Sequence, residues 1–344
     1  MDGRGEILIL RHGPGRGRDV ETLEPALARL AGAKPHLLSA IRFHETGSSA
    51  APALDGVRAV FFWLADPLRE RYPACFEEAQ EIALRARARG IRLVNPPETL
   101  SHTIKSEQAA RWVEAGIPTP RHVTFADRAE LESKLPEFDR GGLLKADLLH
   151  AQRGMWAFAS GAEALRSLDQ RKIVYPGAIA EFVDTRAGFG ATRPGSVWSR
   201  YFHKKRVLVL GDVVSPRSVL FSENPIVGLK TCTFRPPEGW RRVGYSLHPT
   251  VRACIRADRA WWETGGEHHD VMRQAAKALG LDICGIDYAS TADGGVVLWE
   301  ANPFFKLPLR RSYFLPRQRG FEPRYRGFVR ELGDFLEGLL ATPA

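Results

Sequence analysis

The stretch CGIDYASTADGGVVLWEANP, residues 284–303, decides the fold of this chain. Apolar residues flank an Asp-Gly pair at Asp293 and Gly294, which predicts two β-strands joined by a tight turn. In such an antiparallel pair, Asp287 and Glu300 fall roughly opposite each other. An apolar hairpin hides carboxylates only where they are paired or bind a cation. The stretch therefore predicts an acidic pair with a specific partner.

A third oxygen donor joins this pair. Asn302 lies two residues beyond Glu300, so its side chain points to the same face of the strand. Asp287, Glu300 and Asn302 together suit a hard divalent ion such as Mg²⁺, which usually shares its shell with nucleotide phosphates. The alternative interpretation is an acidic hairpin end with ordinary surface ion pairs.

Composition favours a globular protein that attracts small anions. The chain has 344 residues, of which 44% are hydrophobic and 26% charged, and its net charge is +9. The arginines are spread along the chain without basic runs, so nucleotides are better candidate partners than nucleic acid. No apolar run approaches the ~18 residues that span a membrane, and residues 1–6 are too polar to begin a signal peptide, so a cytoplasmic protein is expected. The four scattered cysteines are expected to be reduced thiols.

The N-terminal part has the pattern of an open parallel α/β domain. Strands are expected at residues 6–10, 58–64 and 91–94, with helices at 20–31 and 71–89 between them. Strands that alternate with helices in this way indicate a parallel sheet over residues 1–98.

The pattern changes to α+β after residue 98. We expect a small subdomain over residues 99–184 and a C-terminal subdomain over 185–344, which contains the acidic hairpin. Residues 223–267 are rich in Pro, Gly, Arg and Trp and lack periodicity, so they are expected to be an insertion, either a lid or a small core of its own. A helix over 268–280 leads into the hairpin.

This order resembles the ATP-grasp superfamily, the fold of glutathione synthetase, D-alanine–D-alanine ligase and biotin carboxylase, from Ser101 to Pro303. The hairpin is similar to the magnesium-binding G-x-D…E-x-N end of that family's site. Lys105, followed by a helix and GIPTP at 116–120, and Lys145 on a strand are similar to its two phosphate-contacting lysines. The resemblance implies an ATP-grasp fold with an N-terminal parallel α/β domain, and ATP with Mg²⁺, or Mn²⁺ in its place, as cofactors.

The same resemblance implies roles for further residues. The hinge that contacts adenine through its backbone and ribose through an acid comprises Glu181, Phe182, Val183 and Asp184. Arg206 corresponds to the basic residue that leads into a central strand, and Arg217, just beyond that strand, to an arginine that faces an acyl phosphate. The loop after Lys145 departs from the family, because it contains one glycine where relatives have a glycine-rich flap. Either Gln152 and Gly154 cover the phosphates there, or turnover is weak.

Three residues are candidates for substrate binding. Arg310 and Arg311 follow the metal motif by eight and nine residues, and their guanidinium groups suit an acceptor carboxylate, although a solvated surface turn explains them equally well. His12 ends the first strand, where a parallel α/β domain places its ligand loops.

Together these patterns predict an ATP- and Mg²⁺-dependent ligase that joins a carboxylate to an amine through an acyl phosphate, with small molecules or a peptide as substrates. A small-molecule kinase and a nucleotide-binding regulator on the same fold remain alternatives. A histidine phosphatase is a remote one, suggested by Arg11-His12-Gly13 alone. The sequence identifies neither substrate and leaves dimerisation open.

Overall fold

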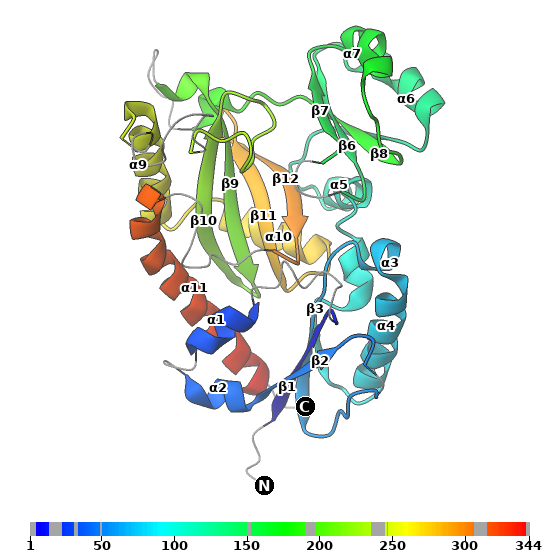
Figure 1. Cartoon of the computed structure of the whole chain (residues 1–344), viewed down its shortest axis with the longest axis vertical. Coiled ribbons are helices and arrows are strands. Elements are labelled where there is room, and N and C mark those ends of the chain that lie inside the picture. Colours follow the sequence, from blue (N-terminus) through cyan, green and yellow to red (C-terminus); the bar gives the residue numbers. More distant parts are fainter. Residues whose placement is uncertain are drawn as a thin grey trace.

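The chain folds around three four-stranded sheets (Figure 1). The computed structural model describes residues 5–13, 23–30, 34–48, 50–149, 153–189, 197–234, 245, 247–305 and 315–341. The predicted mixed α/β class is confirmed, with a parallel sheet first and antiparallel sheets after it. The division into separate units at residues 98 and 184 stays a prediction. No described helix is both long enough and apolar enough to cross a membrane.

The first sheet is parallel, as predicted, with strand order β2-β1-β3-β4. Its strands are β1 (Glu6–Arg11), β2 (Ile41–Glu45), β3 (Val57–Trp63) and β4 (Arg92–Val94). Its helices are α1 (Leu23–Leu30), α2 (Pro35–Ser39), α3 (Leu68–Arg71) and α4 (Pro73–Arg87). The helix predicted over 71–89 corresponds to α4, which starts at Pro73, where a missing N–H costs nothing. Tyr72, at φ −139°, separates it from the short α3 before it.

The second sheet is antiparallel, with strand order β5-β8-β6-β7. Its strands are β5 (His122–Phe125), β6 (Gly142–Ala146), β7 (Met155–Phe158) and β8 (Gly177–Glu181), and the neighbouring helices are α5 (Lys105–Glu114), α6 (Arg128–Lys134) and α7 (Gly161–Ser167). Asp127 caps α6 by accepting a hydrogen bond from Glu130 N at 2.9 Å. This part has its own apolar core around Phe125, Leu144 and Ile179.

The third sheet is also antiparallel and contains the acidic hairpin, with strand order β10-β9-β11-β12. Its strands are β9 (Phe202–Leu210), β10 (Val213–Ser222), β11 (Ile283–Ser290) and β12 (Val296–Asn302), and its helices are α9 (Pro249–Glu263), α10 (His269–Ala278) and α11 (Leu315–Ala341). Short 3-10 helices occur at Pro97–Ser101, Leu135–Glu137, Leu168–Gln170, Arg186–Gly188 and Val197–Arg200.

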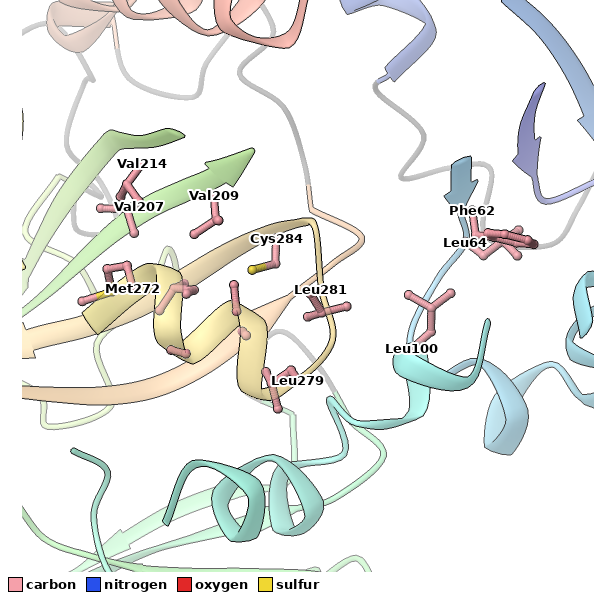
Figure 2. Close-up of a cluster of buried hydrophobic side chains, with 14 of the residues drawn as sticks. Phe62, Leu64, Leu100, Val207, Val209, Val214, Met272, Leu279, Leu281 and Cys284 are labelled. Carbon is pink, nitrogen blue, oxygen red and sulfur yellow. The ribbon is translucent and has the colours of Figure 1, made fainter. Parts of the chain in front are cut away.

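Two cores join the first and third sheets. On one face of the third sheet, Val207 and Cys284 pack against Met272 of α10, and this cluster continues to Leu100 and Phe62 of the N-terminal part (Figure 2). On the other face, Leu208 of β9, residues of α11 and strands β1 and β3 form a second cluster. The strands that carry the acids are therefore held on both faces.

Two predictions about residues 223–267 need correction. Residues 223–267 are not a segment without periodicity, because α9 buries Val251, Cys254, Asp258 and Trp261 at helical spacing. Asp258, a charge on the inner face, hid this pattern, and Trp261 belongs to the core shared with α10 rather than to a small core of its own.

Candidate functional site

Three neighbouring strands, β12, β11 and β9, place Glu300, Asp287 and Arg206 side by side. Asp287 of β11 is directly opposite Glu300 of β12, as the hairpin pattern predicted, and on its other side it is opposite Arg206 of β9. Asn302 is opposite Gly285 and lies on the face that Glu300 shares. A bulge in β12 follows this pairing, since Tyr288 is opposite Leu298. The polar groups therefore meet where the hairpin's regular pairing is interrupted.

Asp287 is the most deeply buried member of this group, with 1% of its surface exposed. Its Oδ2 accepts hydrogen bonds from Lys204 Nζ and Arg206 Nη2, each at 2.7 Å, and its Oδ1 accepts a third from Arg206 Nε. Burial alone raises the pKa of a carboxyl group, but here the charges of Arg206 and Lys204 outweigh burial and hold the pKa of Asp287 below its ordinary value. The carboxylate is thus ionised and paired with two cations.

Lys105 and Lys145 bring positive charge to Glu300 from outside the third sheet. Lys105 Nζ lies 4.0 Å from Glu300 Oε1 and donates to the carbonyl of Leu149. Lys145 is 5% exposed and its Nζ lies 5.9 Å from the centre of the Trp299 ring. Burial lowers the pKa of Lys145 to about 8, against the attraction of Glu300. Lys145 is therefore still mostly a cation at neutral pH.

Helix α5 positions Lys105, which is its first residue. The Asp147 carboxylate, just after β6, accepts from Ser106 N at 3.2 Å and from Ser106 Oγ at 2.7 Å, so it caps the start of the helix. Further along α5, the buried Gln108 Oε1 accepts from Ala301 N at 2.7 Å. These contacts tie α5 to β6 and β12, the strands that contain Lys145 and Glu300.

The predicted hinge residues connect the second sheet to the third. Glu181 ends β8, and Phe182 donates its N–H to Gly141 O at 3.3 Å and packs its ring 5.9 Å from that of Phe202 on β9. Asp184 accepts from Arg186 N and Arg186 Nε at 3.0 Å each, so its carboxylate is paired within the hinge. Val183, between them, is half-buried.

The predicted flap is described in part. Gly154 lies at φ +65°, and a Cβ there would come within 2.8 Å of Ala146 Cβ, so this turn requires glycine. Gln152, the other predicted flap residue, lies outside the described residues, as do Arg310 and Arg311 of the predicted substrate site.

Arg217 lies at an irregular point of β10, one strand further from Asp287 than Arg206. The register of β10 shifts between Pro216 and Ser218, and Arg324 Nη1 lies 3.4 Å from the Arg217 carbonyl to which it donates. The contact of Arg217 with an acyl phosphate stays a prediction.

His12 lies between the ends of β1 and β3. Its Nε2 accepts from Ala65 N at 2.8 Å, its Nδ1 lies 3.8 Å from Cys75 Sγ, and the ring is 3% exposed. A phosphatase nucleophile needs an accessible nitrogen, so this burial argues against the phosphatase alternative. The ring centre lies 6.2 Å from that of Phe304, which directly follows the metal motif. His12 therefore stands beside the predicted site, and its contact with a substrate stays a prediction.

The donor set fits Mg²⁺. Among the described residues, Asn302 Nδ2 is buried without a hydrogen-bond partner, and since the two ends of an amide exchange by a flip, Asn302 can present its oxygen instead. The Glu300 side chain is 25% exposed and so is open to a ligand. No group of three or more His, Cys, Asp or Glu side chains that could hold a metal ion occurs in the described part of the chain.

The sequence interpretation missed one cation, Lys204. Alternate residues of a strand share a face, so Lys204 points to the same side as Arg206, while Lys205 points to the other and donates to Ser290 Oγ at 2.6 Å. Lys204 could have been identified from the sequence, because it lies two residues before Arg206 on the same strand and therefore on the same face.

Neither a known protein family nor a curated relative matches the sequence of this chain. Solved structures do match its fold. The ATP-grasp ligase PsnB, in complex with minimal precursor, Mg and ADP, superposes with a TM-score of 0.54 at 16% identity over 96% of this chain and 97% of that one. D-alanyl-alanine synthetase A from Vibrio cholerae gives a TM-score of 0.52 at 11% identity over 98% and 99%. A RimK domain ATP-grasp protein from Sphaerobacter thermophilus gives 0.51 at 14% identity over 96% and 99%. The chain thus has the ATP-grasp fold, and the predicted resemblance is confirmed at that level.

Proposed function

We propose that this protein is an ATP- and Mg²⁺-dependent ligase that activates a carboxylate as an acyl phosphate and joins it to an amine. Because ATP is the co-substrate and all four cysteines are free, buried thiols, we also propose that it works in the cytoplasm.

One observation supports this proposal above the others. Lys105 of α5, Lys145 of β6 and Arg206 of β9 come from separate parts of an ATP-grasp fold and converge on the acids of a single hairpin. With Lys204, four cations face two carboxylates in the described part of the site. Such an excess of positive charge suits a polyphosphate, whereas a purely structural ion-pair cluster would balance its charges.

The proposed chemistry requires positioning and charge rather than a strong base. A substrate carboxylate attacks the γ-phosphorus of ATP, and the bond to the bridging oxygen breaks as ADP leaves. The amine then attacks the acyl carbon, phosphate leaves with the bonding electrons, and the amine nitrogen loses its proton. Lys105, Lys145 and Arg206 offset the charge on the moving phosphoryl group. Mg²⁺, held by Asp287, Glu300 and Asn302, would neutralise phosphate oxygens when bound.

The remaining roles follow the order of the fold. In this proposal, Glu181, Phe182 and Val183 contact adenine through the hinge, and Asp184 contacts ribose after it parts from Arg186. Among the outer residues, we assign Gln152 and Gly154 to the phosphates and Arg217 to the acyl phosphate. We assign His12, Arg310 and Arg311 to the substrates.

Substrates of this class are carboxylates and amines, and we include peptides among them. PsnB has been solved with a precursor peptide and AMPPNP, and it matches 97% of this chain with a TM-score of 0.53. A peptide and an amino acid offer the same carboxyl and amino groups, so a screen should contain both.

The experiment that tests the proposal is thermal unfolding with and without ATP plus Mg²⁺, on the wild type and Glu300→Gln. At ~100 times Kd, ligand binding should stabilise the wild type by about 2.7 kcal/mol. An increase in the unfolding temperature that requires the metal and is smaller in Glu300→Gln supports the site. Amino acids and peptides are then screened as substrates by measuring ADP release.

The outcomes separate the alternatives on this fold. ADP formed together with a new amide supports the ligase. ADP formed with a phosphorylated product and no amide indicates a kinase, and binding without turnover indicates a regulator. If ATP with Mg²⁺ does not increase the unfolding temperature of the wild type, that result would falsify the proposal.

A further inference from the structure

Asp287 Oδ2 already accepts two hydrogen bonds, so it has no lone pair left for a metal ion in the arrangement described. Its Oδ1 accepts from Arg206, and its Oδ2 accepts from both Arg206 and Lys204 at 2.7 Å. The carboxylate is 1% exposed, so a metal ion could reach it only from within the site. If Asp287 binds Mg²⁺ through Oδ2, one of the two hydrogen bonds to that oxygen must be given up.

An ammonium group and a divalent ion are alternative partners of the same oxygen. Mg²⁺ needs its oxygen ligands at about 2.0–2.1 Å, and a lysine nitrogen hydrogen-bonded to that oxygen would stand in its coordination shell. Two cations at such a distance also repel each other strongly in a buried site. Binding of the ion is therefore in competition with one of the two basic side chains.

Lys204 is the partner that can leave. It donates a hydrogen bond to Asp287 Oδ2 at the end of a flexible four-carbon chain, and its side chain is 19% exposed. Arg206 holds both carboxylate oxygens and lies directly opposite Asp287 on the neighbouring strand. Loss of Lys204 keeps one cation on Asp287, while loss of Arg206 breaks two bonds at once.

We infer that Lys204 is a further binding residue of this site, and that it and a divalent ion compete for Asp287. The coupling of this competition to nucleotide binding rests on the proposed function. A nucleotide supplies phosphate oxygens that accept the displaced ammonium, so the nucleotide removes the competitor of the metal. Metal and nucleotide then bind cooperatively, each strengthening the other by the same factor.

The test measures dissociation constants by calorimetry for MgCl₂ alone, ADP alone, and ADP with saturating MgCl₂. In Lys204→Met we expect Mg²⁺ alone to bind about tenfold more tightly than in the wild type, because a hydrogen bond to a charged group is worth roughly that factor. The strengthening of ADP binding by Mg²⁺ should shrink by a similar factor.

Lys145→Met is the matched control, because it removes a buried cation whose charge acts on Glu300. It should tighten Mg²⁺ binding less than Lys204→Met does. In an Asp287→Asn background the effect of Lys204→Met should vanish. Lys204→Gln, which keeps a donor without the charge, serves as the second variant if Lys204→Met does not fold.

The inference is overturned if Lys204→Met binds Mg²⁺ as the wild type does, or only as tightly as Lys145→Met. It is also overturned if cooperativity with ADP is unchanged. Absence of ADP binding in every protein, together with tighter Mg²⁺ binding in Lys204→Met, would refute the nucleotide site and leave the competition standing. The two proposals can therefore fail separately.

Discussion

Asn95 hydrogen-bonds both main-chain groups of Ile283. Its Nδ2 donates to Ile283 O at 2.7 Å, and its Oδ1 accepts from Ile283 N at 3.0 Å and from Asp282 N at 2.9 Å. Asn95 is fully buried and follows β4, while Ile283 starts β11. One side chain thus joins the first sheet to the strand that carries Asp287.

Replacement of Asn95 by alanine should therefore destabilise the fold. Three main-chain groups, those of Ile283 being buried, lose their partner, and alanine would have to adopt φ +50°. We expect a loss of about 3 kcal/mol in the free energy of unfolding, measured by urea denaturation. Asn224→Ala is the control, because the Asn224 oxygen accepts from Ile226 N at 2.8 Å in an exposed turn, and it should lose under ~1 kcal/mol. Equal losses in the two variants would contradict the role given to Asn95.

Asp258 and Arg324 form a buried ion pair, and loss of one of its charges should destabilise the protein more than loss of both. Their side chains are 2% and 4% exposed, with Arg324 Nη1 at 2.9 Å from Asp258 Oδ2, and Asp258 Oδ1 accepts from Val219 N at 2.7 Å. Removal of one partner leaves a buried charge, so Arg324→Met should cost about 3–5 kcal/mol.

The double variant Asp258→Asn/Arg324→Met checks this explanation. It removes both charges, while the asparagine oxygen can still accept from Val219 N, so it should be more stable than Arg324→Met alone. Additive losses in chemical denaturation would show that the two charges do not stabilise each other.

The stability of the protein should rise with pH above 8 because of Lys145. Burial lowers its pKa from 10.5 to about 8 in the folded state. Between these values the unfolded chain binds a proton that the folded chain has released, so raising the pH favours the folded chain. The cost of burying a charged lysine is fully present below pH 8 and is lost towards pH 10.5, a change of about 3 kcal/mol.

Urea denaturation of the wild type and Lys145→Met, at several pH values, isolates this change. The stability of the wild type relative to Lys145→Met should increase across the window, because methionine does not titrate. Parallel pH profiles would show that Lys145 keeps its ordinary pKa. If the proposed function holds, ATP affinity should fall above pH 8 in the wild type and stay level in Lys145→Arg.

None of the four cysteines should react quickly with a thiol reagent in the native protein. All four are free and buried, and burial raises the pKa of Cys254 to about 11 and also raises that of Cys284. At pH 8 the thiolates of Cys254 and Cys284 are thus scarce, and burial makes all four thiols inaccessible to the reagent. Labelling should reach four thiols only in denaturant. Ser39→Cys, on an exposed helix end, is the control that should react at once. Rapid native labelling of the wild type would contradict this burial.

Local patterns were sufficient for several parts of the fold. The pairing of Asp287 with Glu300 followed from a two-residue strand period and an Asp-Gly turn. The buried face of α10, with Met272, Ala275 and Ala276, followed from helical spacing. The same reasoning failed for α9, because Asp258 faces inward and is neutralised by Arg324, which lies 66 residues away.

The sequence by itself determined the register of the acidic hairpin, since side chains on a strand alternate between faces whatever packs on them. Only the tertiary structure decided which cations reach those acids. Lys105, Lys145 and Lys204 belong to a helix and to strands of two different sheets, and their convergence depends on how α5 and β9 pack against the hairpin. It depends too on buried polar contacts such as Gln108 with Ala301 N. Local periodicity contains no information about such distant contacts, because they arise from burial of apolar faces shared by the whole chain.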